Sequence, residues 1–142
     1  MTGKLTLEQS DIIIEAALQK GRELHSAPLT VAVLDEGGHL KAFRRQDATS
    51  IMRPDIAIAK AWGAIGLGMS SRELGVMCTD RPAFFSTIST LAHGNLVPVP
   101  GGVLIRDSDH QIIGAVGITG DTSDVDESCA IAGIEAAQLQ TL

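Results

Sequence analysis

The sequence has little aromatic side-chain surface and few basic residues. It contains no tyrosine, three phenylalanines and one tryptophan, and its formal net charge is −6 at pH 7. Nucleic-acid recognition needs a basic patch, and binding of single strands also needs aromatic rings on which bases stack. The composition therefore argues against nucleic acid as a partner.

Cysteines and long apolar runs are also scarce. Cys78 and Cys129 are the only two cysteines, and their wide separation is no zinc-ligand spacing. We expect both to be small buried side chains in a reducing compartment. No stretch approaches the roughly 18 consecutive apolar residues of a membrane span, and no apolar leader follows Met1. We therefore expect a cytoplasmic protein without a membrane partner.

The composition is that of a small folded domain. Hydrophobic residues make up 44% of the 142 residues, so we expect one domain spanning residues 1–142. The mean hydropathy of +0.19 is high for a small monomer. It indicates apolar surface buried between subunits, and thus a homo-oligomer.

The pattern of apolar residues, caps and glycines predicts helices and two β-hairpins. Thr6 and Gln9 form a capping box at the start of the first helix, and Ser123 or Asp124 is expected to cap the last. Hairpins imply an antiparallel sheet, and helices must cover it, so the fold class is α+β. The predicted helices cover residues 6–24, 54–67, 70–78, 82–91 and 123–139, and the strands 29–34, 39–44, 102–106 and 111–118.

Glycines are concentrated in the last third of the chain. The pair Gly101–Gly102 precedes one predicted strand, and Gly114, Gly117 and Gly120 lie in or after the next. Glycine in a strand has no side chain to pack, and it often marks a place where another backbone or a ligand approaches closely. The pair either offers backbone N–H groups to an anion or makes a tight turn. Gly101 and Gly102 are thus candidate ligand-binding residues.

Three charged residues are candidates for chemistry. Lys60 lies in an otherwise apolar helical run, so it either extends outward to solvent or marks a pocket. Arg53, with Arg44 and Arg45, flanks the polar loop before this helix and could bind a carboxylate. Asp126 either stabilises the amino-terminal end of the last helix or is a working group, since it closely follows the glycine-rich strand.

The four histidines are candidates for a ligand contact. No two of them share a helical face, so a metal site made by protein side chains alone is not expected. A single histidine could still ligate a haem iron. His39 begins a strand and His93 could face a cleft, whereas His25 closes the first helix and His110 is expected in an exposed turn.

Several motifs occur together and in a familiar order. They are Val31–Leu40 (VAVLDEGGHL), Ala57–Ala61 (AIAKA), Pro100–Val103 (PGGV), Gly114–Gly120 (GAVGITG), and Asp126 followed by Ala130–Gly133. This set, which spans nearly the whole chain, resembles the GlcG/HbpS-like family, also called the haem-degrading domain family.

The resemblance implies a fold, an assembly and a ligand. It implies a profilin-like α+β domain with a five-stranded antiparallel sheet and packed helices, assembled as a homo-oligomer, often an octamer. Some members bind and degrade haem, and the domain also occurs fused to corrinoid adenosyltransferases, where it binds haem. Haem or another tetrapyrrole is then the candidate cofactor, in a cleft between subunits near Lys60, Gly101 and Gly102. His39, His93 and His25 are the candidate iron ligands.

Two other hypotheses remain open. Lys60, Arg53 and Asp126 near glycine-rich backbone could serve a small cofactor-independent enzyme of carboxylate or aromatic catabolism, an isomerase, tautomerase or hydrolase. The third hypothesis is an accessory subunit without chemistry of its own.

Overall fold

The order of helices and strands agrees with the helix caps and turns predicted from the sequence. In the computed structural model, which describes residues 4–142, Thr6 forms the complete capping box with Gln9 at the start of the first helix. The elements are α1 (Leu7–Glu23), β1 (Thr30–Asp35), β2 (Leu40–Arg45), α2 (Arg53–Leu67), α3 (Ser71–Asp80), α4 (Pro82–Leu91), β3 (Gly102–Arg106), β4 (Ile112–Thr119) and α5 (Ser123–Ala136).

The four strands form one antiparallel sheet in the order β2-β1-β4-β3. The central strands β1 and β4 are buried along almost their whole length, which explains why their sequences are continuous apolar runs rather than alternating ones. Strands β2 and β3 are the two edges.

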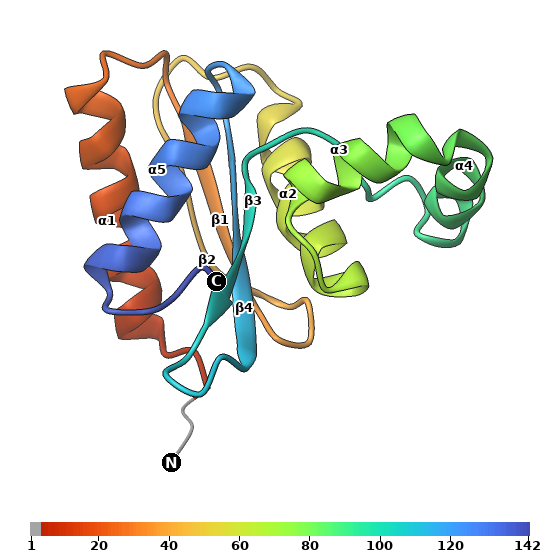
Figure 1. The fold of residues 1–142 in the computed structure, drawn as a ribbon. Helices are drawn as coiled ribbons and strands as arrows, with labels where there is room; N and C mark the ends of the chain where they lie inside the picture. The colour runs from red at the N-terminus through yellow and green to blue at the C-terminus, as the bar shows by residue number, and fades with distance from the viewer. Residues whose placement is uncertain (1–3) are drawn as a thin grey trace.

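Helices cover both faces of the sheet, as Figure 1 shows. Helices α1 and α5 lie side by side on one face, over a core that includes Val31, Val33 and Val116. Helix α2 covers the other face, where the packed side chains are smaller, among them Ala61, Ala64 and Ala115.

Helix α2 packs unusually close to β4 because of Gly117. A Cβ atom at this position would overlap the main-chain carbonyl of Ala57 on α2. Helix and strand therefore meet backbone against backbone, which fixes where α2 lies on the sheet.

Helices α3 and α4 extend away from the sheet (Figure 1). Ser70 caps α3, and its hydroxyl oxygen accepts a hydrogen bond from the Glu73 N–H. Helix α4 contacts α3, carries no charged side chain and has no buried residue. Its apolar side chains thus remain partly open to solvent.

The structure confirms the α+β class but corrects the strand count. The resemblance implies five strands, whereas residues 4–142 form four. Beside the edge strand β3, the chain after α5 makes a single antiparallel bridge, between Arg106 and Gln140. Gln138 has a positive φ of 60°, so the segment turns into β3 and contacts it at one pair only.

The carboxyl-terminal helix also differs from expectation at both ends. Thr122 is its N-cap, with its hydroxyl accepting from the Val125 N–H, rather than Ser123 or Asp124. The helix ends at Ala136, three residues earlier than the pattern predicts, because the chain turns at Gln138. Both thiols are free; Cys129 is buried as expected, but Cys78 is only partly buried. No helix among the described residues has the length and hydropathy needed to cross a membrane.

Candidate functional site

Lys60 and Asp126 form a buried pair at the end of β4. Helix α2 places the Lys60 Nζ 2.9 Å from the Ile118 carbonyl oxygen and 3.3 Å from the Asp126 Oδ2. The two side chains are 3% and 1% exposed. The other carboxylate oxygen of Asp126 accepts a hydrogen bond from the Asp121 N–H at 3.0 Å. One of the two sequence hypotheses, that Lys60 extends outward to solvent, is therefore wrong.

Gly101 and Gly102 pass directly over Lys60. Gly101 has a φ of +129°, and a Cβ there would lie 2.7 Å from Lys60 Nζ and 2.6 Å from the Ile118 carbonyl oxygen. The Gly102 N–H donates to the Ser71 hydroxyl at 2.7 Å, so it is not open to an anion. The glycine pair thus permits a close crossing of the chain over the lysine.

Burial shifts the protonation of both partners. It lowers the pKa of Lys60, against the opposite effect of the Asp126 carboxylate, and the nearby Arg53 charge lowers it further. Burial raises the pKa of Asp126, although hydrogen bonds from Asp121 and Lys60 oppose it. Both shifts reflect the cost of holding charge away from water.

The third charged candidate, Arg53, lies near the pair. Its guanidinium donates to the Thr119 hydroxyl at 2.6 Å, at the end of β4. Arg53, Lys60 and Asp126 line none of the five cavities found on the described part of the chain. The structure thus brings the three residues together, with Lys60 and Asp126 buried between elements and Arg53 partly exposed beside them.

The histidines lie in four different connections, and all are exposed. His39 has the most specific surroundings. Its Nδ1 lies 3.2 Å from the Asp35 Oδ1, and its side chain is 81% exposed. When Nδ1 carries the proton and donates to Asp35, Nε2 is an open lone pair facing solvent. This is the arrangement in which a carboxylate orients a metal-ligating histidine.

Asp35 is held ionised by its turn. Burial alone would raise the pKa of Asp35, but hydrogen bonds from the N–H groups of His39 and Gly37 hold it below its usual value. The same carboxylate thus stabilises the hairpin turn and fixes the His39 ring.

An apolar cavity of about 220 Å³ lies between α2 and α4, near the hairpin. It is lined by Trp62, Gly66, Leu67, Ile88, Leu91, Ala92 and Leu96. Gly38, the residue before His39, has a positive φ of 80°, and a Cβ there would lie 3.2 Å from the Trp62 ring. His93 directly follows Ala92. His93 is therefore next in the chain to a residue that lines this cavity, and His39 is next to a residue that lies against Trp62.

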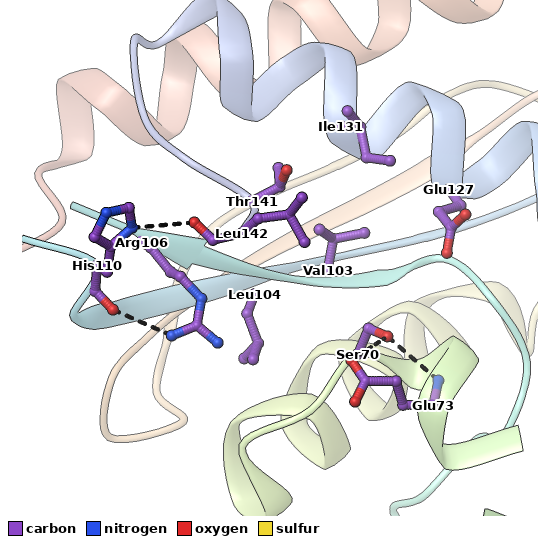
Figure 2. Close-up of a pocket in the computed structure, with 10 residues that line it drawn as sticks. All are labelled: Ser70, Glu73, Val103, Leu104, Arg106, His110, Glu127, Ile131, Thr141 and Leu142. Carbon is purple, nitrogen blue, oxygen red and sulfur yellow. Dashed lines mark hydrogen bonds between the residues drawn. The ribbon is translucent and has the colours of Figure 1, made fainter. Parts of the chain in front are cut away.

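A larger cavity, of about 430 Å³, was not anticipated from the sequence. Figure 2 shows it along the free edge of β3, between α3 on one side and α5 with the last residues of the chain on the other. Val103 and Leu104 line its middle, Arg106 and His110 one end, and Glu73 and Glu127 the other. Its residues come from distant parts of the sequence, which is why no local motif indicates it. Among residues 4–142, no group of three or more His, Cys, Asp or Glu is placed to hold a metal ion.

Comparison with protein families gives one match over most of the chain. The family model described as haem-degrading protein HbpS-like matches residues 5–135. The corrinoid adenosyltransferase PduO of Salmonella typhimurium is 26% identical over 129 residues, which are 91% of this chain and 38% of PduO. A 15.0 kDa protein from the dhaT-dhaS intergenic region of Citrobacter freundii is 25% identical over 126 residues, 89% of this chain and 87% of that protein.

Solved structures share the fold at low identity. The PduOC–haem complex has a TM-score of 0.88 and 23% identity, covering 98% of this chain and 99% of that one. The Klebsiella pneumoniae protein ORFY has a TM-score of 0.86 and 23% identity, covering 97% and 94%. A double mutant of Streptomyces reticuli HbpS has a TM-score of 0.80 and 23% identity, covering 95% and 88%. The chain spans just over a third of the length of the adenosyltransferase it matches.

Proposed function

Because the chain belongs to the HbpS-like family of haem-degrading proteins, we propose that it binds haem or a closely related tetrapyrrole. The observation that carries the proposal is the family match over residues 5–135. It is supported by the PduOC–haem complex, a protein of the same fold that holds haem. The covered position of Lys60 gives no support to the alternative of a cofactor-independent enzyme.

His39 is the residue we propose as the iron ligand. An imidazole nitrogen could hold haem iron, and His39 offers Nε2 to solvent with Nδ1 held by Asp35. The residues beside His39 in the chain offer apolar surface for a porphyrin, since Leu40 is 52% exposed and Gly38 lies against the Trp62 ring. The residues present thus fit the group.

The other candidate residues have different roles in this proposal. His93 is the second candidate ligand, because it follows Ala92 at the rim of the apolar cavity. Lys60, Gly101 and Gly102 have a structural part, since they cover one another and leave no surface for the ring. Asp126 is the buried partner of Lys60, and the partly exposed Arg53 lies beside them.

We further propose that a second copy of the chain completes the haem site. Ligand cavities usually measure about 300–1,000 Å³, so a cavity of about 220 Å³ covers only part of a porphyrin. Helix α4 borders this cavity and leaves apolar side chains open, with Leu91 76% exposed. Contiguous apolar surface of this kind favours burial between subunits. The resulting homo-oligomer is an octamer by analogy with the family. The two free thiols favour a cytoplasmic location.

A hemin titration of the purified protein tests the ligand. We expect a saturable Soret band at one haem per subunit or per dimer in the unaltered protein. His39→Ala should weaken binding at least tenfold or change the spin state read from the visible bands. His110→Ala is the matched control, because His110 is also exposed but lies in the β3–β4 turn. The absence of a saturable Soret band would refute haem binding, and an unchanged spectrum in His39→Ala would refute this ligand.

Light scattering during gel filtration tests the assembly. Leu91→Asp places a charge on the open face of α4 and should reduce the oligomer to smaller species. Leu24→Asp alters an exposed leucine just after α1 and should leave the mass unchanged. A protein that is monomeric before any substitution would contradict the proposed assembly.

A further inference from the structure

The free edge of β3 is closed at both ends and open in the middle. At one end the Ser71 hydroxyl accepts from the Gly102 N–H at 2.7 Å and donates to the Gly102 carbonyl at 3.3 Å. At the other end Arg106 and Gln140 exchange two backbone hydrogen bonds, of 2.8 and 2.9 Å. Gly102 and Arg106, the two end residues of β3, therefore direct their backbone groups away from β4.

Leu104 directs its backbone groups the same way. Backbone groups alternate along a strand, so Leu104, two residues after Gly102, has its N–H and C=O on the same outer edge. Neither group has a partner outside the sheet among residues 4–142. The cavity of about 430 Å³ that Leu104 lines runs along this outer edge of β3.

The two ends of this cavity carry opposite charge, as Figure 2 shows. The Arg106 guanidinium donates to the His110 carbonyl oxygen at 3.1 Å and has further N–H groups to offer. At the other end, Glu73 accepts from the Ser70 hydroxyl and forms no ion pair among the described residues. Glu127, also at that end, is already paired with Arg72. A ligand with a cation at one end and a carboxylate at the other complements this pattern.

We propose that this cavity binds a short peptide, of about three residues, that pairs with Leu104 as an added strand. The Leu104 N–H donates to the carbonyl oxygen of the first peptide residue, and the N–H of the third donates to the Leu104 carbonyl. This is the hydrogen-bond pattern of parallel strands, in which one residue bonds to the two neighbours of the residue opposite. Adding a strand to a free sheet edge is an established way of recognising peptides.

Charge sets the direction of the bound peptide. Running parallel to β3, it places its ammonium group near Glu73 and its carboxylate near Arg106. The antiparallel direction would bring like charges together at both ends, at a cost. Only Leu104 is open between the Ser71 and Gln140 contacts, and the four steps from Gly102 to Arg106 span about 13 Å, at about 3.3 Å per residue. A tripeptide fits this length, whereas a long strand would meet the two closed ends.

Side-chain alternation adds a preference for sequence. The first and third side chains of the peptide face the same way as Val103, toward the apolar surface of Ile131 and Leu142. The middle side chain faces the same way as Leu104, toward Ser70 and Glu73 on α3. We therefore expect apolar residues at positions one and three, and a small or basic residue between them. The proposal is independent of haem.

Calorimetric titration with the peptide Leu-Ala-Leu tests the proposal. We expect saturable binding, which N-methylation of the third residue weakens at least tenfold, because a methyl group replaces the N–H hydrogen that pairs with Leu104. Acetylation and amidation of the peptide ends should also weaken binding at least tenfold. Equal binding of the N-methylated peptide, or no binding at millimolar concentration, would overturn the proposal.

Variants of the protein locate the site. Glu73→Gln keeps the size of the side chain and should weaken binding of the free peptide severalfold, but not that of the acetylated one. Glu36→Gln makes the same charge change in the exposed β1–β2 turn and should have no effect. Equal effects of the two variants would show that only the net charge matters and would overturn the assigned direction. The titration is repeated with hemin-loaded protein; loss of peptide binding there would overturn the independence of the two sites.

Discussion

The Nζ of Lys60 lies 3.3 Å from the Oδ2 of Asp126, and this contact joins α2 to α5 through the end of the sheet. The two helices cover opposite faces of the sheet, so few side chains can link them directly. Gly101 and Gly102 can cross this close to Lys60 because neither residue has a Cβ.

Removal of one partner should destabilise the protein far more than removal of both. Lys60→Met leaves the Asp126 carboxyl buried without its cation, and we expect a loss of about 3–5 kcal/mol of unfolding free energy. The double variant Lys60→Met with Asp126→Leu should recover much of it, because no buried charge remains. Urea denaturation of the two single variants and the double variant gives the coupling energy. Additive losses would contradict a direct pair.

Stability should depend on pH through Asp126. Burial raises the pKa of this carboxyl above its usual value of 3.8, so the folded protein binds the proton more tightly than the unfolded chain. The stabilisation from this group is fully present below the unfolded pKa and is lost as pH rises through the raised folded value. Between about pH 4 and about pH 7 the unfolding free energy should therefore fall more steeply in the unaltered protein than in Asp126→Asn. Parallel curves in urea denaturation would show that Asp126 does not titrate in this window.

The two thiols should react at very different rates. Burial raises the pKa of Cys129 to about 11, so little thiolate forms near neutral pH, and its side chain is inaccessible. Cys78 is partly exposed on α3. Iodoacetamide near pH 8 should label Cys78 alone in the folded protein and both residues in urea, as read by mass spectrometry. Labelling of Cys129 without denaturant would contradict its burial.

Alanine should have opposite effects at two glycines. Gly117→Ala forces a methyl group into the Ala57 carbonyl and should cost about 3 kcal/mol or more, since overpacking costs 1–3 kcal/mol even where side chains can shift. Gly66→Ala lies on the exposed side of α2, where a Cβ makes only an ordinary contact with Trp62. It should stabilise the protein by about 0.5–1 kcal/mol, the helix propensity difference. Thermal unfolding of both variants checks the contrast.

Local sequence patterns predicted most of the secondary structure. The Thr6 capping box, the Ser70 cap and the helix after Arg81 are all present, because each depends on residues within one helical turn. The bounds of each of the four strands differ from the predicted bounds by one residue at most. The errors concern the last helix and the fifth strand, which depend on how the segment around Gln138 meets β3.

The candidate site was predictable only in part. The sequence pointed to Lys60, Asp126 and the glycine pair, and the structure brings them together. It could not show that they would cover one another, since that depends on contacts between residues about sixty positions apart. The contact between Ser71 and Gly102, and with it the open Leu104 edge, is of the same long-range kind.

Ser71 has a consequence beyond its two hydrogen bonds. A sheet edge with free N–H and C=O groups is a template on which further chains can stack, and such stacking leads toward aggregates and fibrils. With one hydroxyl group Ser71 occupies both backbone groups of Gly102, and Gln140 does the same at Arg106 through its own backbone. At both ends of β3 the outward backbone groups are therefore occupied, which leaves only the short stretch at Leu104 for pairing with another strand.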